Sequence, residues 1–128
     1  LGVTDIATVK QCVRAAEDFG KKVVVDMICV DNIPAKVTQM EELGAHILAV
    51  HTGADQQAEG RTPLDDLKVM TDCAKKAKIA VAGGISSKTI DKYVALKPDI
   101  IIVGSAITRA ADPVEEARLI KEAIKKSQ

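Results

Sequence analysis

The sequence predicts an α/β fold of parallel βα repeats, in which four short buried strands alternate with helices. Four apolar runs have the length of strands, and the segments between them carry apolar residues at helical spacing. The last two runs both end in small residues, at Gly83-Gly84 and at Gly104-Ser105. Such alternation is typical of a parallel sheet with right-handed crossovers. At 128 residues the chain fits either a four-stranded doubly wound sheet or half of a (β/α)8 barrel, since a complete barrel takes about 250 residues.

The first part of the chain alternates between helical and strand patterns. A helix is expected at residues 4–20, because Thr4 and Asp5 can cap it and a glycine ends it. A continuous apolar run at residues 23–28 predicts a strand that is covered on both faces. A second helix is expected at residues 31–44, where an early proline and a final glycine mark the ends.

The middle of the chain adds a strand, a loop and a helix. Residues 45–51 form the second apolar run of strand length along the chain. Residues 54–61 are polar and lack an apolar period, so we expect a loop on the same side of the sheet as the glycine bends. A helix is then expected from Thr62-Pro63 to Lys75-Lys76.

The last part of the chain repeats the same unit twice. Strands are expected at residues 79–82 and 100–103, with a helix over residues 86–96 between them. A short turn at residues 106–108 leads to a final helix that Asp112-Pro113 opens. Because no linker or low-complexity stretch interrupts this pattern, residues 1–128 are expected to form a single domain.

The composition argues against several classes of function. Lys plus Arg and Asp plus Glu are balanced at 18 each, so no excess charge attracts nucleic acid or an anionic membrane. Aromatic residues make up only 2%, which leaves no stacking platform for single-stranded nucleic acid. No apolar run approaches the roughly 20 residues of a membrane span, and no signal peptide is recognisable. We therefore expect a cytoplasmic protein that binds neither nucleic acid nor membranes.

The cysteines do not indicate a disulfide or a metal site. Cys12, Cys29 and Cys73 are odd in number and lack the spacing of metal ligands. We expect them to be reduced and to fill space in the core.

Two strand ends carry titratable side chains. Asp26 interrupts an apolar strand, and a buried carboxylate needs a partner, a metal ion or an open cavity. It is either a satisfied structural group or part of a ligand site, and its place at a strand end favours the site. His51 ends the next strand, at a level where its ring can face the same site. His46 lies at the opposite end of that strand and is interpreted as structural.

The two glycine bends predict a phosphate site. Glycine lets a ligand approach the main chain closely, and freed backbone amides can bind an anion. Bends on two neighbouring strands resemble the phosphate cup that follows the last two strands of a (β/α)8 barrel. The alternative is that small residues are needed there only for packing. The candidate phosphate-binding residues are Gly83, Gly84, Gly104 and Ser105.

Four motifs occur in order at the predicted strand ends. They are Val25-Asp26-Met27, Val50-His51-Thr52-Gly53 with Asp55-Gln56-Gln57-Ala58-Glu59-Gly60, Ala80-Val81-Ala82-Gly83-Gly84-Ile85, and Ile102-Val103-Gly104-Ser105-Ala106-Ile107-Thr108. Together they resemble the C-terminal half of the 3-hexulose-6-phosphate synthase family, which belongs to the orotidine monophosphate decarboxylase suprafamily of (β/α)8 TIM barrels. The resemblance covers essentially all 128 residues. It implies that residues 1–128 are a C-terminal half-barrel domain of about four βα units.

The resemblance also implies an activity. The family is an aldolase-type lyase of the ribulose monophosphate pathway of carbohydrate metabolism, which joins formaldehyde to D-ribulose 5-phosphate reversibly through a magnesium-stabilised enediolate. By position, Asp26 would hydrogen-bond the substrate or an active-site cation, and His51 would move a proton to and from the substrate oxygens. The sugar phosphate would be held by the backbone amides of Gly83, Gly84, Gly104 and Ser105. The family forms homodimers with active sites at the subunit interface.

Two alternatives stay open beside the synthase. The related 3-keto-L-gulonate-6-phosphate decarboxylase typically has Glu, Arg, Thr and Arg where this chain has Asp26, Ala54, Ala82 and Ser105. These departures favour the synthase. The other alternative is a non-catalytic phosphosugar-binding half-barrel that pairs with a second copy through its open edge strands.

One family motif is missing. The signature Asp-x-Lys-x-x-Asp, which lies on the third strand of the family barrel, does not occur in the 128 residues. The metal-binding acids of the family lie on its second and third strands, so no metal site is expected in this chain. We therefore expect the second half of a barrel whose first half is absent, inactive as an aldolase by itself although the full-length parent is active.

Overall fold

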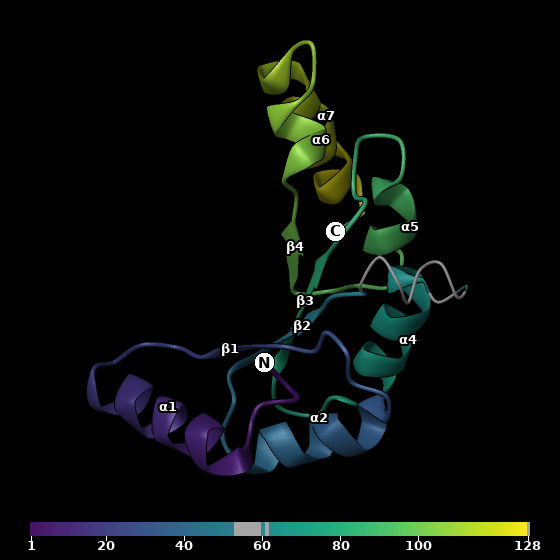
Figure 1. Cartoon of the computed structure of the whole chain (residues 1–128). Coiled ribbons are helices and arrows are strands. Elements are labelled where there is room, and N and C mark those ends of the chain that lie inside the picture. The colour runs from purple at the N-terminus through teal and green to yellow at the C-terminus, as the bar shows by residue number, and fades with distance from the viewer. Residues whose placement is uncertain (53–59, 61, 128) are drawn as a thin grey trace.

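The chain is organised as four strand and helix units arranged in order along one sheet (Figure 1). The structure is a computed structural model, and it describes residues 1–52, 60 and 62–127. The elements are α1 (Ile6–Asp18), β1 (Val24–Asp26), α2 (Ile33–Glu42), β2 (Ile47–Val50), α4 (Pro63–Cys73), β3 (Lys78–Ala82), α5 (Ile90–Val94), β4 (Ile100–Ile102), α6 (Ser105–Thr108) and α7 (Pro113–Lys126).

The four strands pair in parallel and in the order β1-β2-β3-β4. Each strand therefore lies beside the next one along the chain, as right-handed crossovers through helices predict. In one row across the sheet, Asp26 is level with Ala49, Ala80 and Ile100. Since side chains alternate along a strand, this row and the rows beside it face opposite sides of the sheet.

The side chains of the neighbouring rows are buried under the helices. Val25, Leu48, Ile79, Val50 and Val81 are almost inaccessible, and they belong to one apolar cluster with residues of α2 and α4. The helical part of that cluster includes Ile33, Val37, Met40, Leu67 and Met70. Burial of a large aliphatic side chain contributes about 1.5–3 kcal/mol, so this layer holds the fold together.

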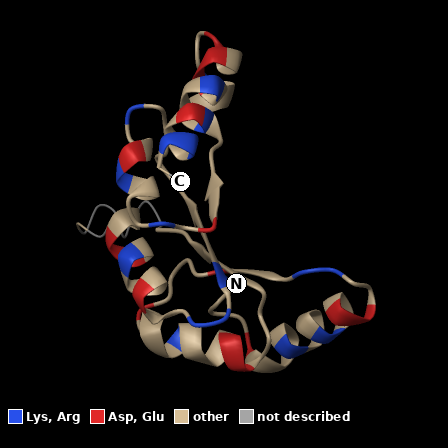
Figure 2. Ribbon diagram, turned by 180° about the vertical axis from the view of Figure 1, so that it is seen from behind, with Lys and Arg blue, Asp and Glu red and all other residues tan. Residues whose placement is uncertain are grey.

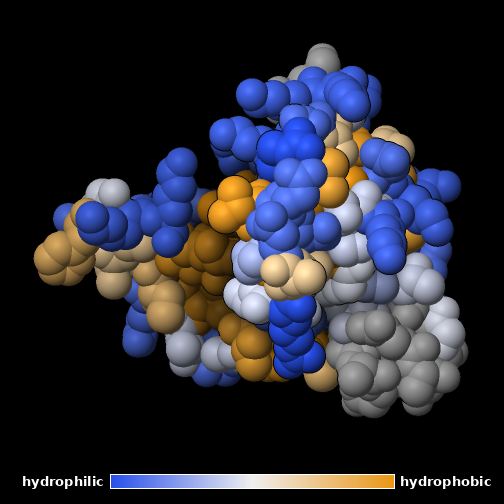
Figure 3. All heavy atoms as spheres, turned by 90° about the horizontal axis from the view of Figure 1, so that it is seen from above, coloured by the Kyte–Doolittle hydropathy of each residue, from blue (hydrophilic) through white to orange (hydrophobic). Residues whose placement is uncertain are grey.

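The opposite face of the sheet is not covered to the same extent. Val24 on β1 is 53% exposed and Ile102 on β4 is 47% exposed, at the two edges of the sheet. Seen from above, apolar atoms lie deep in the space beside the protruding helix α1 (Figure 3). A doubly wound sheet would carry helices on both faces. The predicted α/β fold is therefore confirmed, and its form is four βα units of a TIM-barrel-type fold, a half-barrel.

The predicted helix starts are confirmed by their caps. Side-chain oxygens of Asp5, Asn32, Thr62 and Asp112 accept hydrogen bonds from backbone N–H groups in the first turns of α1, α2, α4 and α7. Such caps satisfy donors that a helix leaves unpaired, and each is worth about 1 kcal/mol.

Three sequence-based expectations need correction. The helix predicted at residues 86–96 is shorter, α5, because residues 86–89 form a turn that side-chain contacts hold. The turn predicted at residues 106–108 is a short helix, α6. The strand predicted at residues 23–28 ends at Asp26, because Cys29 adopts a left-handed backbone with φ of 60° as the chain bends toward α2.

The prediction for the cysteines was also wrong in part. Cys12 and Cys29 are exposed, and Cys73 is partly buried. Helix α1 projects from the rest of the molecule (Figure 1) and buries only Val9 and Val13, which leaves Cys12 in solvent. Burial raises the pKa of the Cys73 thiol, so this group stays protonated at neutral pH.

Charged residues of both signs alternate along the helices, and the strands carry few of them (Figure 2). No helix in the described part of the chain has the length and apolar character that crossing a membrane requires.

Glu41 on α2 joins two distant segments. Its Oε1 accepts hydrogen bonds from the backbone N–H groups of Lys75, Lys76 and Ala77, at 2.8, 2.7 and 2.9 Å. Burial acts to raise the pKa of this carboxyl, but the three amide contacts outweigh it and hold the pKa below its ordinary value of 4.5. The carboxylate therefore fixes the turn that leads from α4 into β3.

Glu41→Ala is expected to lower the free energy of unfolding by about 1–3 kcal/mol, because three charge-assisted hydrogen bonds are lost. A depressed pKa stabilises the fold above the ordinary value and loses that effect as pH falls through the lowered value. The difference between wild type and variant should therefore shrink below pH 4.5 in urea unfolding. Glu42→Ala, at the exposed neighbouring position, is the matched control. Equal losses in both variants at neutral pH would contradict the prediction.

Candidate functional site

The structure brings Asp26 and His51 together at the carboxyl edge of the sheet. Asp26 is the last residue of β1, and His51 directly follows β2, so the parallel register places them side by side. His51 Nδ1 lies 2.9 Å from Asp26 Oδ2, and Asp26 Oδ1 accepts the N–H of Ile28 at 2.9 Å. The side chains are 44% and 36% exposed respectively, so a small molecule can reach both.

This geometry selects the state of the histidine ring. An ionised carboxylate only accepts hydrogen bonds, so the contact places a proton on Nδ1 of His51. In the neutral ring Nε2 then carries a lone pair. The arrangement can therefore accept a proton at Nε2 and return it.

A hydrogen bond between two buried side chains also fixes the end of β2, and the sequence did not predict this contact. The hydroxyl of Thr52, next to His51, donates to Asp66 Oδ2 at 2.9 Å, and both side chains are buried. Asp66 lies in the first turn of α4. In the sequence it stands among the ordinary acidic residues of a helix start, and only the fold shows its contact with Thr52.

The two glycine bends lie side by side. Ala82 of β3 is level with Ile102 of β4, so Gly83-Gly84 and Gly104 follow neighbouring strands at the same edge. Gly83 and Gly84 have φ angles of +107° and +66°, which L side chains rarely adopt, and no atom lies within 4 Å of a Cβ built on Gly84. Ser105 begins α6 and is exposed. The four residues predicted to bind phosphate, Gly83, Gly84, Gly104 and Ser105, are therefore exposed at one edge of the sheet.

His46 has a structural contact at the other edge of the sheet. Its Nδ1 accepts the N–H of Val23 at 3.1 Å, where the chain enters β1. This contact agrees with the structural interpretation. The polar segment predicted as a loop at residues 54–61 lies outside the described residues except for Gly60, and Ala54 lies outside them too.

The described residues include one carboxylate at this edge that could take part in binding magnesium, Asp26. Within the described ranges, no group of three or more His, Cys, Asp and Glu side chains is placed to hold a metal ion. Mg²⁺ in proteins is typically bound by one or two carboxylates together with waters and substrate oxygens. Asp26 is a carboxylate of the kind that can contribute to such a set.

Residues 1–120 match a protein-family model described as the orotidine 5'-phosphate decarboxylase / HUMPS family. The chain belongs to this family. Two curated relatives named 3-hexulose-6-phosphate synthase, from Staphylococcus epidermidis and Staphylococcus haemolyticus, are 47% and 45% identical over 124 residues. These matches cover 97% of this chain, and the chain spans 59% of the length of each relative.

Two solved structures are similar to nearly the whole of this chain and to just under two thirds of their own chains. A crystal structure of 3-hexulose-6-phosphate synthase from Salmonella typhimurium is 59% identical, with a TM-score of 0.92, and the match covers 99% of this chain and 60% of that one. A structure named KGPDC from Streptococcus mutans is 24% identical with a TM-score of 0.79, over 98% of this chain and 58% of that one, and shows the fold alone. The recognition made from the four motifs is therefore confirmed.

Proposed function

We propose that the full-length protein is a 3-hexulose-6-phosphate synthase, an aldolase-type lyase that joins formaldehyde to D-ribulose 5-phosphate reversibly. The observation that carries the proposal is the 59% identity to the Salmonella typhimurium synthase, over 99% of this chain. The lower identity to KGPDC, 24%, favours the synthase over a keto-gulonate-phosphate decarboxylase.

The residues at the carboxyl edge have distinct roles in this proposal. A proton leaves C1 of the sugar to give the enediolate, C1 then bonds to the carbon of formaldehyde as the carbonyl π bond breaks, and the formaldehyde oxygen takes up a proton. His51 Nε2 exchanges that proton with the substrate oxygens, while Asp26 orients the ring and stabilises its cation. The amides of Gly83, Gly84, Gly104 and Ser105 bind the phosphate and fix the sugar against this pair.

The remaining machinery is proposed to lie outside these 128 residues. Magnesium would stabilise the enediolate, and most of its ligands, with the Asp-x-Lys-x-x-Asp strand, would belong to the other half of the barrel. On this proposal residues 1–128 form one C-terminal half-barrel domain. A homodimer and a cytoplasmic location are proposed on the family resemblance.

The 128-residue chain alone is expected to show no turnover of ribulose 5-phosphate and formaldehyde, whereas the full-length parent consumes formaldehyde in a magnesium-dependent way. The physical reason is that positioning and metal stabilisation each supply a large part of an enzymatic rate enhancement. Formaldehyde consumption by both proteins is the measurement. Turnover by the short chain would contradict the division of the machinery.

The competing functions are separated with the full-length protein. Release of CO₂ from 3-keto-L-gulonate 6-phosphate, without formaldehyde release from the hexulose 6-phosphate, would favour the decarboxylase. Phosphosugar binding without either reaction would favour a binding half-barrel.

A further inference from the structure

Two side chains of the segment that follows the Gly83-Gly84 bend donate hydrogen bonds to its carbonyl groups. Tyr93 Oη donates a hydrogen bond to the carbonyl of Gly83 at 3.1 Å, and Thr89 Oγ1 donates to the carbonyl of Gly84 at 3.1 Å. Tyr93 is 6% exposed, and burial raises the pKa of its hydroxyl, which therefore remains a donor.

Fixing these two carbonyls also fixes two amides. In a trans peptide the C=O and the following N–H point in opposite directions. The N–H groups of Gly84 and Ile85 must therefore point away from Tyr93 and Thr89. Within the described residues, neither of these N–H groups makes a hydrogen bond. The bend thus leaves two oriented donors without a protein partner, one on Gly84, which is exposed, and one on Ile85, a residue that is 3% exposed.

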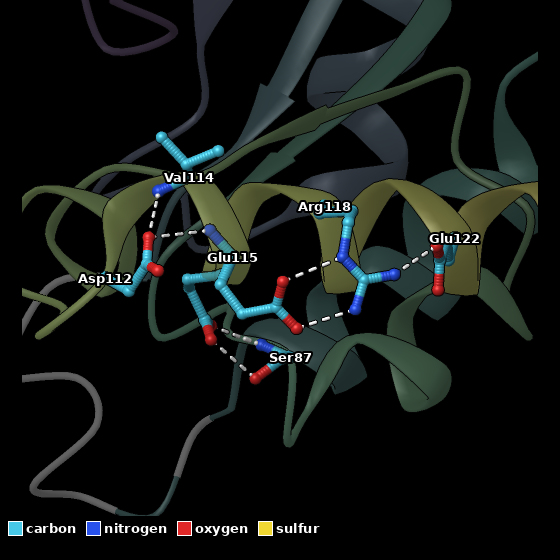
Figure 4. A network of polar contacts seen from close by, with 7 residues as sticks. Ser87, Asp112, Val114, Glu115, Arg118 and Glu122 are labelled. Carbon is cyan, nitrogen blue, oxygen red and sulfur yellow. Dashed lines mark hydrogen bonds and ion pairs between the residues drawn. The ribbon is translucent and has the colours of Figure 1, made fainter.

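A second contact reaches the same loop from the last helix. Glu116 on α7 accepts the N–H and the hydroxyl of Ser87, both at 2.7 Å, across 29 residues of chain. These two hydrogen bonds lower the pKa of the Glu116 carboxyl, so it is ionised at neutral pH. Figure 4 shows Ser87 beside α7, on which Asp112 caps the first turn and Arg118 pairs with Glu115 and Glu122.

We propose that Tyr93 and Glu116 are positioning residues for the phosphate of the substrate: they hold the Gly83-Gly84 bend so that the amides of Gly84 and Ile85 face it. The inference rests on the proposed function for the identity of the ligand as a phosphosugar. Glu116 acts through Ser87, three residues beyond Gly84, and Tyr93 acts directly on the Gly83 carbonyl. Neither side chain needs to touch the phosphate.

The test is a titration of the 128-residue chain with inorganic phosphate, followed by the ¹H–¹⁵N signals of Gly84 and Ile85. In the wild type both signals are expected to shift on binding. Tyr93→Phe and Glu116→Ala are each expected to weaken binding about tenfold, since the first removes a neutral hydrogen bond to the bend and the second removes two charge-assisted hydrogen bonds to Ser87. Both variants should also shift the Gly84 and Ile85 signals before phosphate is added. Glu116→Gln, which keeps one acceptor oxygen for Ser87, should recover part of the affinity.

Glu115→Ala is the matched control on the same helix, because Glu115 contacts Arg118 and not the loop. Thermal unfolding of all variants separates a loss of affinity from a loss of fold. Unchanged affinity in folded Tyr93→Phe and Glu116→Ala would overturn the inference, and so would a wild type whose two amide signals ignore phosphate. Weakened phosphate binding in the variants, together with a full-length protein inactive as an aldolase, would overturn the proposed function and leave this inference standing.

Discussion

Replacing His51 by glutamine in the full-length protein is expected to lower kcat of the aldolase reaction by about 10²–10⁴-fold, the usual contribution of a positioned acid–base group. Nε2 of His51 is the atom proposed to exchange a proton with the substrate oxygens, and glutamine cannot do so near neutral pH. KM for ribulose 5-phosphate should change little, since the phosphate is bound elsewhere on the same edge.

The chain has two histidines, and the one outside the proposed site, His46, provides the control. His46→Gln changes a ring that accepts the Val23 N–H at the opposite edge of the sheet, so it should affect stability more than kcat. Asp26→Asn tests the contribution of the carboxylate that contacts His51. An amide in place of the carboxylate can no longer stabilise the His51 cation, and kcat should fall while the ring itself is retained. An unchanged kcat in His51→Gln would remove the proton-transfer role.

The approach of Asp26 to His51 was predictable because it follows from topology. Parallel strands place their carboxyl ends at one edge, and the register of β1 with β2 then brings the two side chains within 2.9 Å. The placement of the two glycine bends follows for the same reason, from the register of Ala82 with Ile102. The apolar periodicity and the order of the strands were therefore enough to predict that these residues lie at one edge of the sheet.

Other features depend on contacts between segments far apart in sequence. Glu41 holds amides 34–36 residues away, and Glu116 holds Ser87 from 29 residues away. The second contact helps to keep residues 86–89 in a turn, which explains why the predicted helix there is too long. The exposure of Cys12 likewise depends on how little of α1 packs against the sheet. No local pattern encodes such partners.

Gly84→Ala is expected to raise KM of the full-length protein for ribulose 5-phosphate by about 10- to 100-fold, the equivalent of one or two charge-assisted hydrogen bonds to phosphate. A methyl group at this position would occupy open space at the bend, where no protein atom lies within 4 Å. It would also strain a backbone whose φ is +66°. The methyl group would keep the phosphate away from the bend, and the strain would turn the Gly84 and Ile85 amides away from the phosphate.

Gly20→Ala is the control that separates backbone strain from a loss of contact with the phosphate. Gly20 has nearly the same φ, +61°, also has no atom within 4 Å of a built Cβ, and lies beyond the end of α1, away from the proposed site. The two variants should therefore lose similar stability, about 1 kcal/mol for a left-handed L residue. Only Gly84→Ala should lose affinity for the phosphosugar. Equal KM values in the two variants would mean that the bend serves packing alone, because strain without a ligand contact acts on the fold and not on binding.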